Sequence, residues 1–313
     1  MSIRSNISKD YHKRRKIMDA IGKTIFRTAG MISAVLIVLI FVFITIRGIR
    51  VFLPNYEYGQ VNLIDFLTGL VWRQDQGNYG VLFIVINTLV ASIGAAILSF
   101  PISVLTALFI VKIAPKNLKS LFTTVVELLA AIPSVVYGVF AAGVIVKGVE
   151  GIAAAFGVST FGGNSLLAVI ILLAIMIFPT MTSIAIVAIQ SVDVKIELGS
   201  LALGASKTQT NFKVVLAAAK SGIFAGLILG LGRAFGEATA VSMVAGNKFY
   251  GPTTSIFDIT RTLTSTMLSG LKETSGLDYD IRFSVGIVLM MVILMTNFLV
   301  HWVKRRIGSV TNE

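Results

Sequence analysis

Six stretches of nearly uninterrupted apolar residues divide this chain, and each is long enough to cross a bilayer. A hydrocarbon core of about 30 Å needs roughly 20 helical residues, at a rise of about 1.5 Å per residue. Two long polar segments, 47–80 and 191–220, connect some of these stretches. The pattern predicts an all-α integral membrane protein. Its six predicted transmembrane helices cover residues 29–46, 82–111, 121–146, 166–189, 221–244 and 283–303.

The composition agrees with this class. Of 313 residues, 55% are hydrophobic and only 13% are charged. In soluble domains about a quarter of all residues are charged. Cysteine is absent, which excludes a disulfide scaffold, a thiol nucleophile and Cys-ligated metal. The two histidines, His12 and His301, lie at opposite ends of the chain. We therefore expect no catalytic residue, no metal site and no cofactor on this chain.

The basic residues alternate between the connecting segments. Eight precede residue 29, three lie at 112–119, four at 195–220 and three at 304–306, whereas the other connections together hold eight. Because cytoplasmic segments are enriched in Lys and Arg, both termini are expected in the cytoplasm, which requires an even number of spans. This bias also accounts for the net charge of +12 without nucleic acid as a partner.

The same bias divides the chain into three parts. We expect a cytoplasmic basic N-terminus (1–28), a six-helix transmembrane domain (29–303) and a cytoplasmic tail (304–313). The first apolar stretch is of spanning length and no small-residue cleavage site follows it, so we expect it to be retained rather than removed as a signal peptide.

Two full charges, Arg233 and Glu237, stand inside the fifth apolar stretch. On a continuous helix they would lie one turn apart and neutralise each other, so one interpretation is a purely structural ion pair. Intramembrane charges usually mark a substrate path. Since arginine stays protonated and its fork of donors matches tetrahedral oxyanions, the second interpretation is an anion pathway.

Glycines surround this pair at a spacing of four. Small residues at that spacing let helix backbones approach closely, so we expect the fifth helix to be central and packed along two stripes. The first stripe holds Gly222, Gly226 and Gly230, and the second holds Gly232 and Gly236.

The third stretch contains Glu127, which either faces the pathway or lies at the membrane interface near the helix end. Pro133 follows six residues later and frees a backbone carbonyl that neighbours must satisfy. Ser134 is the adjacent candidate, both for local hydrogen bonding and for lining the pathway.

No nucleotide-binding loop accompanies these features. Gly22-Lys23-Thr24 has Ile17 where the first glycine of a phosphate-binding loop should stand. Either transport is passive or ion-coupled, or the ATPase is a separate subunit. The long segment 191–220 is either an ordinary connection or a docking surface for such a subunit.

The segment from Glu197 to Ile223 resembles the cytoplasmic EAA loop of ABC importer permeases, the coupling helix that sits on the ATPase. Gly204 and Ala205 fall at the glycine position of that loop. Leu198 stands where the first glutamate is usual, with Glu197 one position early, and Leu216-Ala217 replaces the usual Leu-Pro. The resemblance implies a type I ABC importer permease with a coupling loop at Glu197, Gly204 and Ala205.

The blocks GLGRAFGEATAVSMVAGN (230–247) and VELLAAIPSVVYG (126–138) resemble the PstC permeases of the phosphate-specific transport family. The resemblance implies phosphate as substrate and a pathway containing Arg233 and Glu237. It also implies a second, PstA-like permease, two copies of an ATPase that binds the ATP, and an extracytoplasmic phosphate-binding protein. The rival interpretations are a permease for sulfate or molybdate, a stand-alone anion channel or carrier, and a sensor or scaffold that does not transport.

Overall fold

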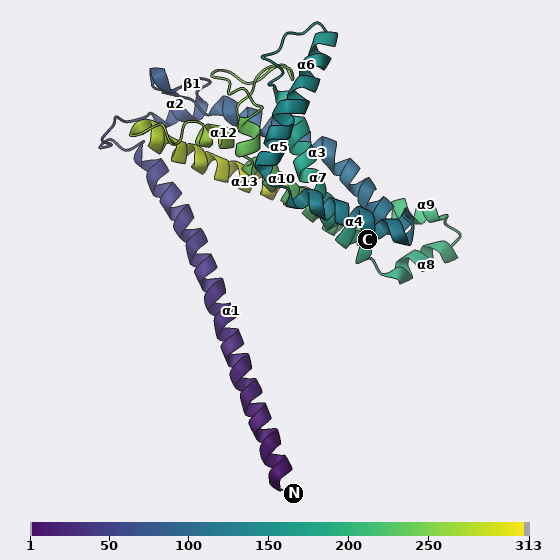
Figure 1. Ribbon diagram of the computed structural model, residues 1–313. Helices are drawn as coiled ribbons and strands as arrows, with labels where there is room; N and C mark the ends of the chain where they lie inside the picture. The colour runs from purple at the N-terminus through teal and green to yellow at the C-terminus, as the bar shows by residue number, and fades with distance from the viewer. Residues whose placement is uncertain (1, 310–313) are drawn as a thin grey trace.

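Six helices of the computed structural model are long and apolar enough to cross a membrane, which confirms the predicted number (Figure 1). The structure describes the backbone of residues 2–309 and the side chains of residues 18–304. The six candidate spans are Met18–Arg50, Leu82–Ile113, Ser134–Ala155, Leu166–Gln190, Lys207–Gly236 and Leu277–Lys304.

Three of the spans combine several helical elements, and the other three lie within single helices. The first half of the chain contains α1 (Ser2–Arg50), α2 (Leu63–Thr68), α3 (Leu82–Leu108), the π-helix η2 (Phe109–Ile113), α4 (Lys116–Ala131), α5 (Ser134–Phe140), η3 (Ala141–Ile145) and α6 (Val146–Ala155). The second half contains α7 (Leu166–Gln190), α8 (Val194–Ala202), α9 (Lys207–Gln209), η4 (Thr210–Val215), α10 (Leu216–Gly236), α11 (Thr239–Ser242), α12 (Leu263–Leu268) and α13 (Leu277–Ser309). Between α2 and α3, β1 (Trp72–Arg73), the turn η1 (Gln74–Gln76) and β2 (Asn78–Tyr79) form a small antiparallel hairpin.

The centre of the bundle is α7, the span with the largest buried share. It packs against α3 and α10, and its core positions include Leu172, Ile177 and Met181. A helix that is apolar on every side is expected to be surrounded by others. The two ends of the bundle differ: α8 and α9 lie at one end, and the β1–β2 hairpin and α12 lie at the other (Figure 1). We call these the coupling end and the hairpin end.

The predicted third span is wrong in its position. A single helix over 121–146 was expected, but the chain is extended at Ile132 and Pro133, with ψ angles of 128° and 142°. Proline disfavours helical backbone at the residue before it and is well tolerated in the first turn of a helix. As a result α4 ends, α5 begins, and the third span becomes Ser134–Ala155.

The predicted fifth span, 221–244, is also corrected. The helical stretch begins at Lys207 and ends at Gly236, and Glu237 is already extended with ψ 113°. The short α11 follows as a separate turn. Arg233 and Glu237 therefore do not share one continuous helix.

Helix α1 leaves the bundle and extends far from it (Figure 1). Its C-terminal part is fixed to α13, where Ser284 Oγ donates to the Gly48 carbonyl at 2.7 Å and Arg47 pairs with Asp280 at 3.2 Å. None of its apolar window is buried within this chain. It runs through residue 28 without a break, so the limit between tail and span stays a prediction.

Candidate functional site

Arg233 lies in the last turn of α10 and points to α7. Its Nη1 donates to Thr180 Oγ1 at 3.0 Å, and the side chain is half-buried. Thr180 directly follows Pro179, which is itself buried in α7. Arg233 also lies close enough to Tyr137 of α5 to interact with it electrostatically. The guanidinium is thus held by a neutral hydroxyl.

A structural ion pair between Arg233 and Glu237 was one of the two interpretations. Among the residues whose side chains are described, none of the four ion pairs joins them. Glu237 instead caps the short helix that follows: its Oε1 accepts from the Ala240 backbone N–H at 2.9 Å. Its carbonyl accepts from Thr264 Oγ1 of α12 at 2.7 Å. Glu237 therefore stabilises the break between α10 and α11. Its carboxylate does not neutralise the positive charge of Arg233.

The break packs against α5. A Cβ on Gly138 would lie 2.6 Å from Met243 Sδ and 2.9 Å from Ala240 Cα, so glycine permits this close approach. Directly before Gly138 in the chain, Tyr137 donates its hydroxyl hydrogen to the Leu129 carbonyl at 2.8 Å and bridges the Pro133 break. Segments around Arg233, Tyr137 and Thr180 thus meet where two helices are interrupted.

The other two predicted pathway residues differ in how far they are buried. Ser134 is half-buried at the start of α5, one turn before Tyr137, whereas Glu127 is exposed on α4. The pathway roles of Ser134 and Glu127 stay predictions. Sequence reasoning missed Thr180 and Thr264, although a Pro-Thr pair inside an otherwise apolar span is a usable signal for the first.

The glycine stripes separate into a packed and an open one. Gly222, Gly226 and Gly230 all face α7; a Cβ on Gly222 would lie 2.5 Å from Ala188 Cβ. A Cβ on Gly232 or Gly236 would meet nothing within 4 Å. The first stripe packs as expected, and the second packs against no part of the described chain. Gly236 instead borders a cavity of about 490 Å³ that also reaches Arg282.

At the coupling end, α8 and α9 form a helix–turn–helix on the surface. Gly204 has φ +85° in the turn and a Cβ there would meet nothing, so the backbone conformation is what requires glycine. Leu203, beside it, is 91% exposed. No residue of α8 is buried. An exposed apolar surface of this kind is typical of a protein–protein contact.

Glu197 is not free for such a contact. It forms an ion pair with Lys112 of η2, 85 residues earlier in the chain. The side chain of Lys112 is 18% exposed and that of Glu197 is 20% exposed. Ser200 and Thr210 add a hydroxyl contact of 3.0 Å between α8 and η4. The predicted coupling residue therefore ties α8 to the end of the α3–η2 span, and Ala205 lies half-buried in the turn.

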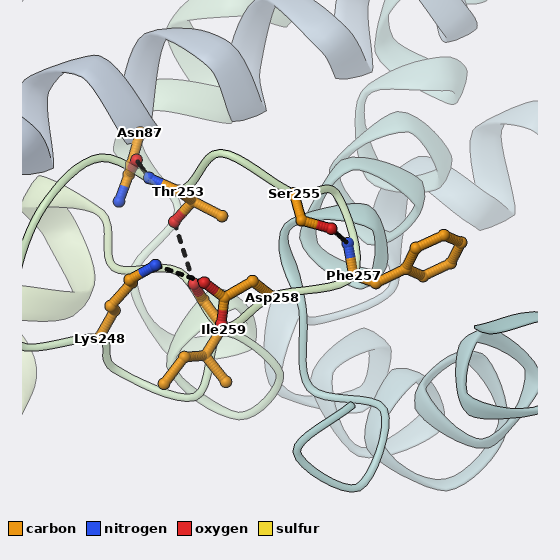
Figure 2. A network of polar contacts seen from close by, with 7 residues as sticks. All are labelled: Asn87, Lys248, Thr253, Ser255, Phe257, Asp258 and Ile259. Atoms are coloured by element: carbon orange, nitrogen blue, oxygen red, sulfur yellow. Dashed lines mark hydrogen bonds and ion pairs between the residues drawn. The ribbon is translucent and has the colours of Figure 1, made fainter. Parts of the chain in front are cut away.

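At the hairpin end, a polar network fixes residues 246–262 over α3 (Figure 2). Asn87 Oδ1 accepts from the Thr253 N–H at 2.8 Å, and Thr253 Oγ1 donates to the Ile259 carbonyl at 3.0 Å. Lys248 pairs with Asp258 in the same loop. The sequence analysis did not single out Asn87, since an isolated amide in an apolar run carries no specific pattern.

The fold and this arrangement define a helical membrane transport subunit, and the chain matches known proteins of that class. Residues 99–309 match the family model described as binding-protein-dependent transport system inner membrane component. The chain belongs to this family, the permease subunits of ABC importers, which work with another permease, ATPases and a binding protein.

Several curated relatives cover most of the chain. A probable ABC transporter permease protein, YqgH of Bacillus subtilis, is 35% identical over 94% of this chain and 93% of its own length. The phosphate transport system permease protein PstC of Pasteurella multocida is 29% identical over 81% and 84%, and PstC 2 of Mycobacterium tuberculosis is 30% identical over 88% and 90%.

Solved structures show the same fold. A bacterial ABC transporter involved in the import of alginate aligns with a TM-score of 0.61 at 20% identity, covering 93% of this chain and 99% of the other. The MetNI methionine ABC transporter aligns with a TM-score of 0.53 at 18% identity, covering 72% and 94%. The family match and the solved structures confirm the resemblance to type I ABC importer permeases. The sequence relatives confirm the resemblance to PstC.

Proposed function

We propose that this chain is the transmembrane permease subunit of an importer that moves inorganic phosphate into the cytoplasm, driven by ATP hydrolysis in a separate subunit. The observation that carries the proposal is Arg233: a guanidinium inside the bundle, beside two helix breaks, held by Thr180 and not paired with Glu237. The relatives named as phosphate permeases support the choice of phosphate.

Arg233 suits a transported oxyanion because its planar fork donates several hydrogen bonds in a fixed geometry. A carboxylate paired to it would compete with the anion, and Glu237 is engaged at α11 instead. The Thr180 hydroxyl, which accepts from Arg233, supplies a further polar group beside it. Only a weak, reversible site permits transit, so one arginine with neutral neighbours fits the task better than a cluster of cations.

The rest of the machinery follows from the two ends of the molecule. The α8–α9 surface would dock one of two ATPase copies, with ATP bound by those partners and not by this chain. The open glycines Gly232 and Gly236 would face a second, PstA-like permease. At the hairpin end an extracytoplasmic phosphate-binding protein would deliver the substrate. Both termini would then lie in the cytoplasm.

The decisive experiment is uptake of radiolabelled phosphate by cells that lack this chain and carry either the wild type or Arg233→Ala. We expect uptake to fall at least about tenfold in the variant, the factor that corresponds to about 1.4 kcal/mol of lost anion binding. Arg73→Ala is the matched control, because Arg73 is an exposed arginine paired with Asp75 in the hairpin.

Competitors decide the substrate. Excess sulfate or molybdate should leave phosphate uptake intact; if either abolishes it, the chain serves another oxyanion. Normal uptake with Arg233→Ala in an assembled complex would contradict a pathway through α10.

A further inference from the structure

Buried polar atoms without a hydrogen-bond partner gather at the hairpin end. Buried polar groups are nearly always hydrogen-bonded, so each exception calls for an explanation such as a bound ion. Among the described side chains, Ser99 holds one such atom near the middle of α3. All the others lie in or against the hairpin and residues 246–262: Gln74 Nε2, Asn87 Nδ2, Asn247 Oδ1, Thr260 Oγ1 and Arg261 Nε.

Hydrogen bonds and a cation–π contact link several of these groups into one cluster around Arg261. Its Nη2 donates to the Asn247 carbonyl at 3.1 Å, and its guanidinium lies 5.3 Å from the centre of the Phe249 ring. The Phe249 carbonyl in turn accepts from the Trp72 N–H at 2.8 Å, which attaches the hairpin that carries Gln74. Two donors, Arg261 Nε and Gln74 Nε2, remain unpaired in this cluster.

A second guanidinium completes the charge of the cluster. Arg282 Nη2 donates to Gln74 Oε1 at 3.5 Å, and Arg282 acts electrostatically on Arg261. Arg261 is only 5% exposed and Arg282 only 2%. Neither belongs to an ion pair among the described residues.

The acids nearby are already engaged. Asp258 pairs with Lys248. Asp278 interacts electrostatically with Arg282 and accepts a hydrogen bond from the Tyr79 hydroxyl at 2.6 Å. Burial and this hydrogen bond raise the pKa of Tyr79. Burial and the charge of Arg282 lower the pKa of Arg261 to about 10, so it is still protonated at neutral pH. Buried charge of one sign without a matching partner is costly.

We propose that Arg261 and Gln74, with Arg282 as the second charge, bind a small inorganic oxyanion at the hairpin end, at a site separate from Arg233. An anion there offsets the two guanidiniums and accepts from both unpaired donors. Because Arg261 is only 5% exposed, a small free ion suits this site better than a lipid headgroup. The binding itself is independent of the proposed function. Only its use as an entry station for transported phosphate rests on that function.

The test is equilibrium binding of radiolabelled phosphate to the purified full-length chain in lipid nanodiscs. The protein carries Arg233→Gln, so that binding at the proposed pathway site does not contribute. We expect saturable binding of about one phosphate per chain, displaced by sulfate but not by chloride at constant ionic strength. Arg261→Gln should weaken it at least tenfold, and Arg73→Gln, on the exposed face of the same hairpin, should leave it unchanged.

A second variant protects the test against misfolding. Gln74→Met keeps the size of the side chain and removes its free donor, and it should weaken binding severalfold even if Arg261→Gln does not fold. Absence of saturable binding, or equal affinity in wild type and Gln74→Met, overturns the proposal. If the wild type imports phosphate normally and the chain with Arg233→Gln shows no saturable binding, this site alone is refuted. If that chain binds phosphate and the wild type does not import it, the proposed function alone is refuted.

Discussion

Arg233 meets its hydrogen-bond acceptor 53 residues earlier in the chain, at Thr180. A threonine hydroxyl orients a guanidinium without neutralising it, which a carboxylate would do. The nearby Glu237 is used for the backbone of α11. At the scale of single residues, the site is therefore a charged donor fixed in place by neutral groups and left available for an anion.

Thr180→Val tests this orientation. Valine matches the shape of threonine but cannot accept from Arg233, so we expect assembly to persist and phosphate uptake to fall roughly fivefold, equivalent to about 1 kcal/mol for one charge-assisted hydrogen bond at a half-buried position. Uptake assays with quantified membrane protein measure the effect. Thr182→Val is the control on the same helix, because Thr182 Oγ1 donates only to the Phe178 carbonyl of its own helix; equal losses in both variants would contradict the role of Thr180.

At the scale of elements, α8 matters because so little holds it. It buries no residue, and the Lys112–Glu197 pair ties it to η2, which continues the core helix α3. A movement imposed on α8 by a docked ATPase would be passed to α3 through this pair.

Charge reversal tests the tie. Lys112→Glu or Glu197→Lys should lower the phosphate transported per ATP hydrolysed, while the double variant Lys112→Glu/Glu197→Lys should restore it, because the attraction is regained with the charges exchanged. The measurement is uptake and ATPase activity in proteoliposomes. Lys116→Glu, at an exposed position of α4, is the control. A double variant no better than the single ones would argue against a direct electrostatic tie.

The two glycine stripes of α10 make a second prediction at this scale. Gly222→Val should destabilise the chain by about 1–3 kcal/mol, the usual range for overpacking, because the new side chain meets Ala188. Gly232→Val meets nothing within the described chain and should leave its folding unchanged but weaken assembly with the second permease. Thermal unfolding of the detergent-solubilised chain and co-purification of the subunits separate the two effects; the idea fails if both variants act alike.

At the scale of the whole molecule, the two ends of the bundle differ and one apolar helix is left exposed. The hairpin and the α8–α9 surface occupy opposite ends (Figure 1), and the apolar window of α1 has no buried residue in the part of the chain that the structure describes. A subunit built in this way needs lipid and partner subunits to bury that surface.

The absence of cysteine makes the predicted orientation directly measurable. Single cysteines at Met18, Arg73 and Lys207, all exposed positions, can be labelled with a membrane-impermeant maleimide. We expect Arg73→Cys to react in intact cells, and Met18→Cys and Lys207→Cys to react only after permeabilisation, since basic segments stay in the cytoplasm. Labelling of Met18→Cys in intact cells would reverse the first span and exclude the six-span topology with both termini inside.

The sequence alone was enough to predict the class of the protein and the number of its spans, because apolar length and the distribution of Lys and Arg are local properties to which a bilayer responds directly. It also indicated Arg233 and the packed stripe of Gly222, Gly226 and Gly230. Only the tertiary structure decided that α10 ends at Gly236, that Arg233 is held by Thr180, and that Glu197 pairs with Lys112. Those outcomes depend on hydrogen-bond partners supplied by distant helices, such as Thr264, whose hydroxyl donates to the Glu237 carbonyl. Helical periodicity carries no information about partners far away in the chain.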